Sequence, residues 1–79
     1  MRITVKLFAT FRRYRPELPP GTGMPLEVPP GANVTLVMER LGIPDEMPLV
    51  AMVNSEVVHP DRVLAEGDTV SLFPPIAGG

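Results

Sequence analysis

Prolines limit the length of nearly every element that this chain can form. The sequence holds eleven prolines among 79 residues, and a proline can neither continue a helix nor donate to a sheet ladder. Pro16 would end one possible helix, Pro44 blocks the extension of another, and the pair Pro29-Pro30 stops a strand. We therefore expect short elements within a single domain, because 79 residues provide a compact core for no more than one.

The first segment, residues 2–8, alternates between apolar and polar side chains. Ile3, Val5 and Leu7 fall on one face, and a period of two with β-branched residues predicts a half-buried strand. A shorter strand is expected over residues 24–28, and we expect it to pair antiparallel with the first.

The connection between these two strands combines a possible short helix with a loop. Phe11 and Tyr14 stand three residues apart, a spacing that allows two helical turns before Pro16. Residues 16–25 contain four prolines and two glycines, which predicts a loop. Its prolines reduce the conformational entropy that a long connection loses on folding.

One helix is predicted in the middle of the chain. Asn33 is suited to the N-cap position, where its side-chain oxygen can accept a hydrogen bond from the first turn. Gly42 suits the left-handed position just after the helix. Four apolar residues follow the spacing i, i+3, i+4, i+7 and form one stripe: Val34, Val37, Met38 and Leu41.

The second half of the chain contains two apolar runs, residues 49–53 and residues 69–73. We expect the first run to be a central strand covered on both faces, followed by a tight turn and a short strand at residues 57–58. The second run is expected to be the last strand, entered through a turn at Gly67-Asp68.

The order strand, strand, helix, strand, short strand, strand predicts an α+β fold of two layers. This order is that of a ubiquitin-like β-grasp, with a mixed four- to five-stranded sheet packed on one main helix. The first and last strands are expected to run parallel in the middle of the sheet. The two apolar runs leave open which of their alternate residues face inward, and we expect the buried face to comprise Ile3, Val5, Leu7, Val50, Met52, Val70 and Leu72.

The composition argues against catalysis by this chain alone. There is no cysteine, which excludes disulfides, thiolate zinc sites and cysteine nucleophiles. His59 has no second histidine to join it, and no spaced cluster of carboxylates suggests a metal site. Asp61, Glu66 and Asp68 are interpreted as turn and surface residues because they lie around Gly67. We expect a carrier or binding protein that is not an enzyme and holds no cofactor.

Charge and hydropathy also restrict the partners. The net charge is −2, and the cluster Arg12, Arg13 and Arg15 is interpreted as a solvated face, so we expect no nucleic-acid partner. No apolar run reaches the length of a membrane span. Arg2 and Lys6 interrupt the apolar N-terminal segment, which argues against a signal peptide. A cytoplasmic location without membrane association is therefore expected.

The C-terminal segment "FPPIAGG" is the best candidate for chemistry. Pro74-Pro75 cannot continue a sheet ladder and favour an extended path. Gly78 and Gly79 lack a Cβ, so the segment could enter a channel too narrow for side chains. The segment ends in a free α-carboxylate, a group with an unperturbed pKa of about 3.5.

The sequence resembles the MoaD/ThiS family of ubiquitin-like sulfur carriers over nearly its whole length. The resemblance is carried by "VKLFAT" in the first strand, "GANVTLVMERLGI" in the helix, "MVNSEVV" in the central hairpin, and "LAEGDTVSLFPPIAGG" at the end. The terminal stretch is the most specific of these, and it is similar to that of the molybdopterin synthase small subunits.

The resemblance implies a function for the C-terminus. In the family, an activating enzyme of the ubiquitin-activating type uses ATP and magnesium to adenylate the last glycine, which becomes a thiocarboxylate. Gly79 would carry the sulfur, and Gly78 would give slender access. The sulfur would pass to a molybdopterin synthase large subunit or to a thiazole synthase. The residues expected at the partner interface are Phe8, Val57, Phe73, Pro74, Pro75, Ile76 and Ala77.

Three readings of the chain stay open at this point. The leading one is a sulfur carrier for molybdopterin (molybdenum or tungsten cofactor) biosynthesis. The second is a thiamine-type carrier or a ubiquitin-like protein modifier joined through Gly79, and the third is a plain interaction module. In each case we expect residues 1–75 to form the β-grasp domain and residues 76–79 to form a flexible tail.

Overall fold

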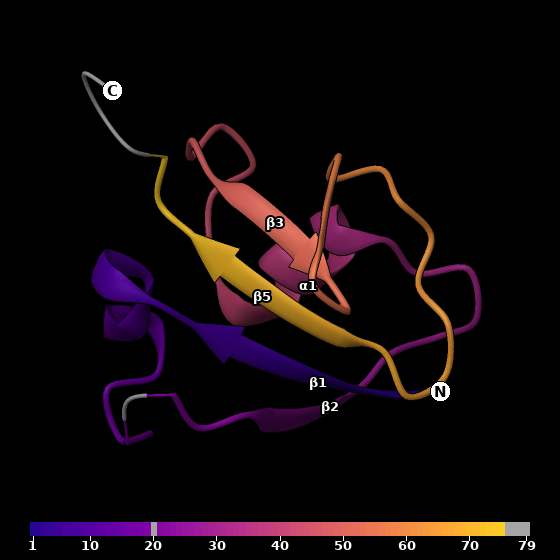
Figure 1. Cartoon of the computed structure of the whole chain (residues 1–79), viewed down its shortest axis with the longest axis horizontal. Coiled ribbons are helices and arrows are strands. Elements are labelled where there is room, and N and C mark those ends of the chain that lie inside the picture. The colour runs from indigo at the N-terminus through magenta and orange to yellow at the C-terminus, as the bar shows by residue number, and fades with distance from the viewer. Residues whose placement is uncertain (20, 76–79) are drawn as a thin grey trace.

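The structure, a computed structural model, describes residues 1–19 and 21–75. Within them five strands, one α-helix and one 3₁₀-helix follow one another along the chain (Figure 1). Their order and bounds are β1 (Arg2–Leu7), η1 (Ala9–Tyr14), β2 (Met24–Glu27), α1 (Val34–Leu41), β3 (Val50–Val53), β4 (Glu56–Val58) and β5 (Thr69–Phe73).

The five strands form one mixed sheet in the order β2-β1-β5-β3-β4. β1 pairs antiparallel with β2 and parallel with β5, while β3 pairs antiparallel with both β5 and β4. The last strand therefore occupies the centre of the sheet, beside the first. The prediction of an α+β β-grasp with parallel first and last strands is confirmed.

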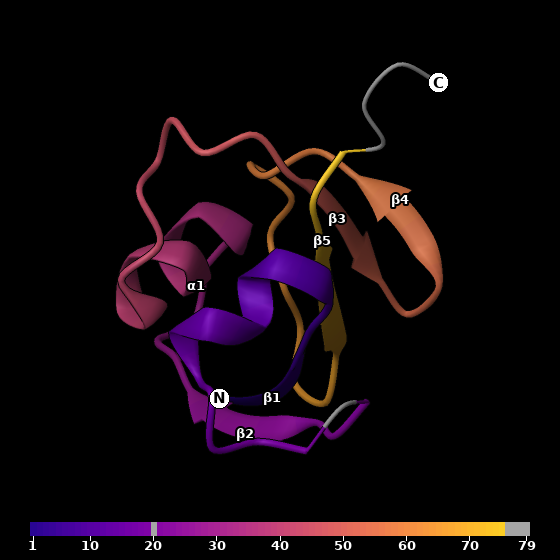
Figure 2. The ribbon, with the colours of Figure 1, turned by 90° about the vertical axis from the view of Figure 1, so that its left-hand side faces the viewer.

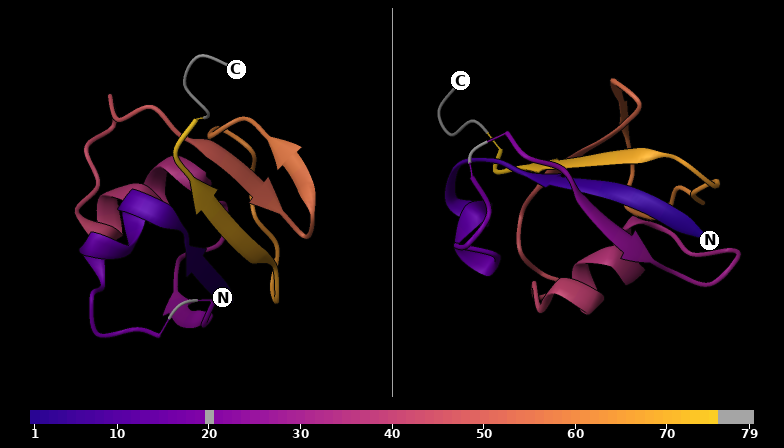
Figure 3. Two further views of the ribbon diagram at one scale, coloured as in Figure 1. Left: turned by 60° about the vertical axis from the view of Figure 1, so that its left-hand side comes forward. Right: turned by 90° about the horizontal axis from the view of Figure 1, so that it is seen from below.

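Helix α1 packs against one face of the sheet, and the opposite face has no covering helix in the part of the chain described (Figures 2 and 3). The Asn33 side-chain oxygen accepts a hydrogen bond from the Leu36 N–H at 2.9 Å, and Gly42 closes the helix at a φ of 83°. The predicted stripe is buried toward the sheet, since Val34, Val37, Met38 and Leu41 are all at most 3% exposed. The two caps set the ends of α1, and the stripe sets which side of the helix packs on the sheet. We call the face of the sheet that α1 covers the inner face.

One part of the predicted core was wrong. Val50 and Met52 are only half-buried and lie on the uncovered face, whereas Ala51 and Val53 are buried beneath the helix layer. Pairing with β5 sets this orientation, because Ala51 lies opposite the buried Leu72. For the same reason, the expectation that this strand is covered on both faces was also wrong.

The segment after β1 is a 3₁₀-helix where the sequence allowed two helical turns. Phe11 is 2% exposed and anchors η1 in the core, with Tyr14 packed beside it at a ring distance of 6.2 Å. Beyond η1, the Leu18 N–H donates to the Arg15 carbonyl across Pro16. The chain then runs back to the edge strand β2, as expected for a loop.

One turn joins β3 to β4 and another leads into β5, and a side-chain hydrogen bond connects the two turns. Asn54 and Ser55 have φ angles of 51° and 74°, as a two-residue hairpin with both central residues left-handed requires. The Asn54 amide donates to the Asp68 carboxylate at 2.9 Å, and Asp68 also accepts from the Ala65 N–H at 2.8 Å. Asp68 is thus a turn residue, as the sequence indicated.

Candidate docking surface and C-terminal segment

The uncovered face of the sheet is apolar at one end. Strand alternation sends Val70 and Leu72 of β5 inward and Phe73 outward. On the neighbouring strand, Val50 lies opposite Phe73 and shares its face. Because residues paired across strands lie on the same side of a sheet, the apolar side chains of this face gather where β5 ends. We call this face the outer face.

A second row of the outer face runs across the sheet one step further from the end of β5. Val57 of β4 pairs with Met52, Met52 pairs with Ser71, and Ser71 pairs with Lys6. Val57 is 67% exposed. The row therefore changes from apolar at the β4 edge to polar at β1, so the apolar area has a defined border.

Two phenylalanines join the ends of β1 and β5. Phe8 and Phe73 stack with ring centroids 4.5 Å apart and an interplanar angle of 12°. The Phe8 N–H also donates to the Leu72 carbonyl at 3.1 Å. Both side chains are half-buried, because each covers one face of the other. The stack gives the last described residues of the chain a rigid base.

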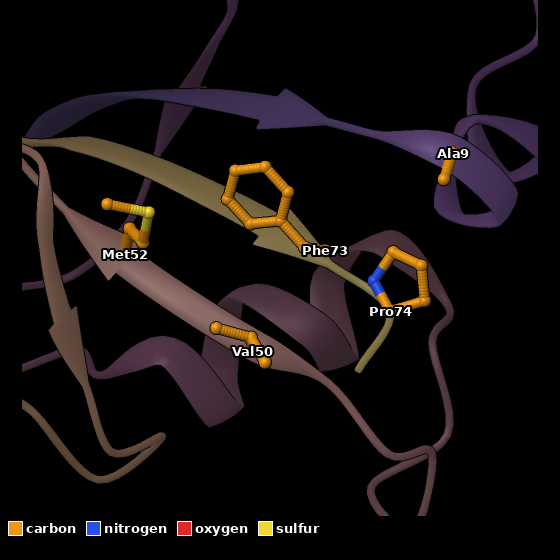
Figure 4. A pocket seen from close by; sticks show the side chains of 5 residues that line it. All are labelled: Ala9, Val50, Met52, Phe73 and Pro74. Atoms are coloured by element: carbon orange, nitrogen blue, oxygen red, sulfur yellow. The ribbon is translucent and has the colours of Figure 1, made fainter. Parts of the chain in front are cut away.

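Next to this stack lies an open apolar depression of about 420 Å³ (Figure 4). Phe73 and Pro74 line it from the end of β5, and Val50 and Met52 line it from β3. Ala9, the first residue of η1, completes it. Apolar concavities on a protein surface are typical of sites where a partner inserts side chains.

The structure brings several of the predicted site residues together. Phe8, Phe73 and Pro74 meet at the end of β5, and Pro75 follows them in an exposed position. Val57 lies on the same face but at the far edge, on the row through Met52. A role of these residues in binding a partner stays a prediction.

The remaining predicted site residues lie outside the described part of the chain. They are Ile76, Ala77, Gly78 and Gly79. The prediction of a flexible tail over residues 76–79 concerns the same positions. The structure therefore describes the base from which the segment departs, and the depression beside that base.

Three residues of the depression were not predicted as site residues. Val50 and Met52 were assigned to the core, because an all-apolar strand carries no alternation to show which face is inward. Ala9 has no sequence signal of its own. The sequence held half of the answer: Ser71, between Val70 and Leu72, indicates which side of the run 69–73 faces outward. Pairing with β5, which only the structure shows, then places Met52 on that side.

Helix η1 carries a short cluster of arginines. Arg12 and Arg13 of η1 are exposed, and within residues 1–19 and 21–75 neither forms an ion pair. The Arg13 guanidinium lies 5.4 Å from the centre of the Tyr14 ring, close enough for a cation–π interaction. η1 thus carries two exposed cations, and of its residues Ala9 lines the depression.

The described residues offer no alternative centre for chemistry. Among them, no three His, Cys, Asp or Glu side chains gather as a metal site would require. His59 is exposed in a turn where its carbonyl accepts from the Arg62 N–H. The Glu66 carboxylate accepts from the Arg2 N–H, which makes it a structural contact.

None of the helices in the described ranges has the length and apolar character that crossing a bilayer requires.

The fold and the bare apolar face define a ubiquitin-like β-grasp protein with a surface beside its C-terminal segment. Residues 5–79 match the ThiS family. The chain therefore belongs to this family of ubiquitin-like sulfur carriers, and the resemblance to the MoaD/ThiS proteins is confirmed. No curated protein matches the chain.

Solved structures with the same fold come from archaea and bacteria. A putative molybdopterin converting factor subunit 1 from Pyrococcus furiosus is 27% identical with a TM-score of 0.74, over 96% of this chain and 99% of that one. Small archaeal modifier protein 1 of Haloferax volcanii is 20% identical with a TM-score of 0.73, over 95% and 98%. A complex of subunits 1 and 2 of molybdopterin-converting factor from Helicobacter pylori matches at 18% identity and a TM-score of 0.60, over 100% of both chains.

Proposed function

We propose that this protein carries sulfur as a thiocarboxylate on Gly79 and donates it in molybdopterin biosynthesis. Membership of the ThiS family over residues 5–79 is the observation that carries the proposal. The likeness to a putative molybdopterin converting factor subunit 1, at 27% identity over nearly the whole chain, favours the molybdopterin pathway. In this role the chain is the non-catalytic small subunit of a synthase.

The proposed chemistry explains why the carrier depends on an activating enzyme. A carboxylate is a poor acyl donor, because an oxide would have to leave. In the proposed first step a Gly79 carboxylate oxygen attacks the α-phosphorus of ATP, and magnesium pyrophosphate leaves. Hydrosulfide supplied by another protein then attacks the acyl carbon, AMP leaves, and the loss of the sulfur-bound proton gives the thiocarboxylate. The sulfur comes from outside because the chain has no cysteine.

The outer face supports the proposal as the surface that docks these partners. Its apolar depression adjoins Phe73 and Pro74, so a partner seated there would receive the C-terminal segment directly. The expected partners are an adenylating enzyme and the synthase large subunit. The second is favoured because the Helicobacter pylori structure with the same fold is a complex of subunits 1 and 2 of molybdopterin-converting factor.

Intact-mass spectrometry of the protein isolated from its native host tests the sulfur chemistry. We expect a species heavier by the difference between one sulfur and one oxygen, which disappears after alkylation of the thiocarboxylate. Deletion of Gly79 should abolish this species and adenylation, while circular dichroism stays unchanged because the core residues that the structure describes lie between Ile3 and Leu72. A Gly79-deleted chain that is still adenylated would contradict the proposal.

Reconstitution of the synthase reaction with purified proteins distinguishes the molybdopterin pathway from the thiamine pathway. The thiocarboxylated protein should support product formation with a molybdopterin synthase large subunit from the same organism and not with a thiazole synthase. The reverse result would assign it to thiamine biosynthesis. Recovery of lysine isopeptides to Gly79, without the thiocarboxylate, would instead establish a protein modifier, the class to which the named Haloferax volcanii protein belongs.

A further inference from the structure

The sheet has two edges, and the hydrogen bonds within it show that their backbones are exposed differently. β2 forms one edge and β4 forms the other (Figure 2). In an antiparallel pair, the N–H and C=O of successive residues point alternately toward the neighbouring strand and away from it. A residue of an edge strand that points away therefore offers its donor and acceptor to solvent or to another chain.

On β2 the outward donor is missing at one position. The Thr4 N–H donates to the Asp68 carbonyl at 2.9 Å, so the backbone of Thr4 points toward the β5 side and away from β2. Pro25, the partner of Thr4 in β2, must then point its backbone nitrogen to the open side. Proline has no N–H to donate, and a proline on an edge strand hinders the addition of another strand.

On β4 the outward donor is present. The Asn54 N–H donates to the Thr69 carbonyl of β5 at 2.9 Å, so the backbone of Asn54 points toward β5. By alternation Met52, two residues earlier, points toward β5 as well. Val57 of β4 is the partner of Met52, and the two therefore form a pair without mutual hydrogen bonds. Val57 thus points both its N–H and its C=O to the open side of the sheet.

The side chains at this edge suit an added strand. Val57 is 67% exposed and lies next to Met52, which lines the depression. An extended segment paired with β4 would place an apolar side chain beside Val57, in the row that leads to the depression. Charges commonly protect an edge against such pairing, but the Glu56 carboxylate of β4 lies 3.5 Å from the Arg62 guanidinium, which balances its charge.

We propose that the edge of β4 pairs with an extended segment of the adenylating enzyme, through the N–H and C=O of Val57. The inference rests on the proposed function and adds a strand of the partner to the sheet. A second copy of this chain is a poorer occupant, because pairing of two three-residue strands covers far less than the roughly 1,200 Å² that stable interfaces bury at least. The adenylating enzyme would reach that area because, under the proposed function, it also covers the depression, which begins at the neighbouring Met52.

Amide hydrogen exchange tests the pairing without a mutation. The isotope-labelled chain would be followed by NMR, free and saturated with the adenylating enzyme of the same organism. We expect the Val57 amide to exchange quickly in the free chain and about 10-fold more slowly in the complex, because it gains a hydrogen bond there. The Glu27 amide of β2 is the matched control and should not change. It also points outward, because its partner Arg2 accepts from the Gly67 N–H on the β5 side.

Val57→Pro provides a second test, through activity. It removes the outward N–H and leaves the ladder with β3 intact, as Pro25 does on the opposite edge. In carrier-dependent ATP–pyrophosphate exchange we expect kcat/KM to fall about 5-fold with kcat unchanged, because docking is weakened and the chemical step is not. Val57→Thr, which keeps the N–H and the β-branched shape, is the matched control and should lose less than about twofold.

The outcomes separate the edge pairing from the proposed function. Unchanged exchange of the Val57 amide on binding, or equal kcat/KM for Val57→Pro and Val57→Thr in folded chains, would overturn the edge pairing alone. Slow exchange of this amide in the free chain at high concentration would indicate pairing between copies and would also overturn it. If circular dichroism shows that Val57→Pro does not fold, the amide measurement decides by itself. A wild-type chain that supports no ATP–pyrophosphate exchange would overturn the proposed function and the edge pairing with it.

Discussion

The two faces of the sheet are made by the same strands, but α1 covers only one of them. On the inner face, Val5, Val70 and Leu72 are completely buried under α1. On the outer face, Phe73 is half-buried and Val57 is mostly exposed, although both are as apolar as their inward neighbours. Hydrophobicity alone therefore does not separate core from surface in this protein. What separates the faces is which of them the helix covers.

This difference shows which face of the sheet contributes most to the stability of the fold. Buried apolar area stabilises a fold by about 25 cal/mol per Å², and the inner face holds nearly all of it. The outer face can lose an apolar side chain with little effect on folding. It keeps such side chains at a cost in solubility, as expected for the docking surface proposed above.

Leu72→Ala and Phe73→Ala, adjacent in β5, provide the largest test of this comparison. Leu72 is completely buried, so its truncation should lower the free energy of unfolding by about 3 kcal/mol through lost burial and a residual cavity. Phe73→Ala loses mainly the stack with Phe8 and should cost about 1 kcal/mol. Urea unfolding followed by circular dichroism measures both. Equal losses would show that the outer face contributes to stability as much as the inner one.

The helix that covers the inner face depends on its N-cap. Asn33→Ala removes the hydrogen bond to the Leu36 N–H and should cost about 1 kcal/mol in unfolding free energy. Asn33→Ser, which keeps a capping oxygen, is the control and should lose only a small part of that. If Asn33→Ala left the midpoint of urea unfolding unchanged, packing alone would hold α1 on the sheet.

The β3–β4 turn sets the register of the outer face and contains a strained residue. Ser55 has a φ of 74°, a conformation that favours glycine. Ser55→Gly should therefore raise the free energy of unfolding by about 0.5 kcal/mol, since relief of strain is partly offset by a more flexible unfolded chain. Ser55→Ala retains the strain and should give no gain. Thermal unfolding of both variants measures the difference. A gain with alanine would point to the hydroxyl group instead.

The smallest expected effect is that of Val57→Thr in β4, with the neighbouring Val58 as its contrast. Val57 faces outward, and Val58 packs against the core opposite Ala51. Val57→Thr should change the free energy of unfolding by less than about 0.5 kcal/mol, whereas Val58→Thr should lower it by about 1 kcal/mol because a hydroxyl enters an apolar site. Thermal unfolding compares the two. A larger loss at Val57 would contradict the assignment of faces on this strand.

The sequence predicted the fold where local signals were unambiguous. The alternation in β1 assigned Ile3, Val5 and Leu7 to the inner face, and the capping residues Asn33 and Gly42 placed both ends of α1. These signals are local, since they depend on the pleat of a strand and on the backbone groups that a helix leaves unpaired. Tertiary contacts did not need to be known.

The candidate site was predictable only in part. Phe8, Phe73 and Pro74 follow from their place at the ends of strands, but the assignment of Val50 and Met52 depends on pairing with β5. That pairing joins residues far apart in the sequence, and an all-apolar strand is compatible with either orientation. The depression also needs Ala9, whose position depends on how η1 turns after β1.

The parallel pairing of β1 with β5 has a consequence for the order of folding. The two strands lie near opposite ends of the described chain, and closing so long a loop is a slow step in folding. The Phe8–Phe73 stack and the depression cannot exist until that step is complete. A ribosome-bound or clipped chain would therefore lack the depression. If the proposed function holds, the architecture itself would restrict activation to molecules that have finished folding.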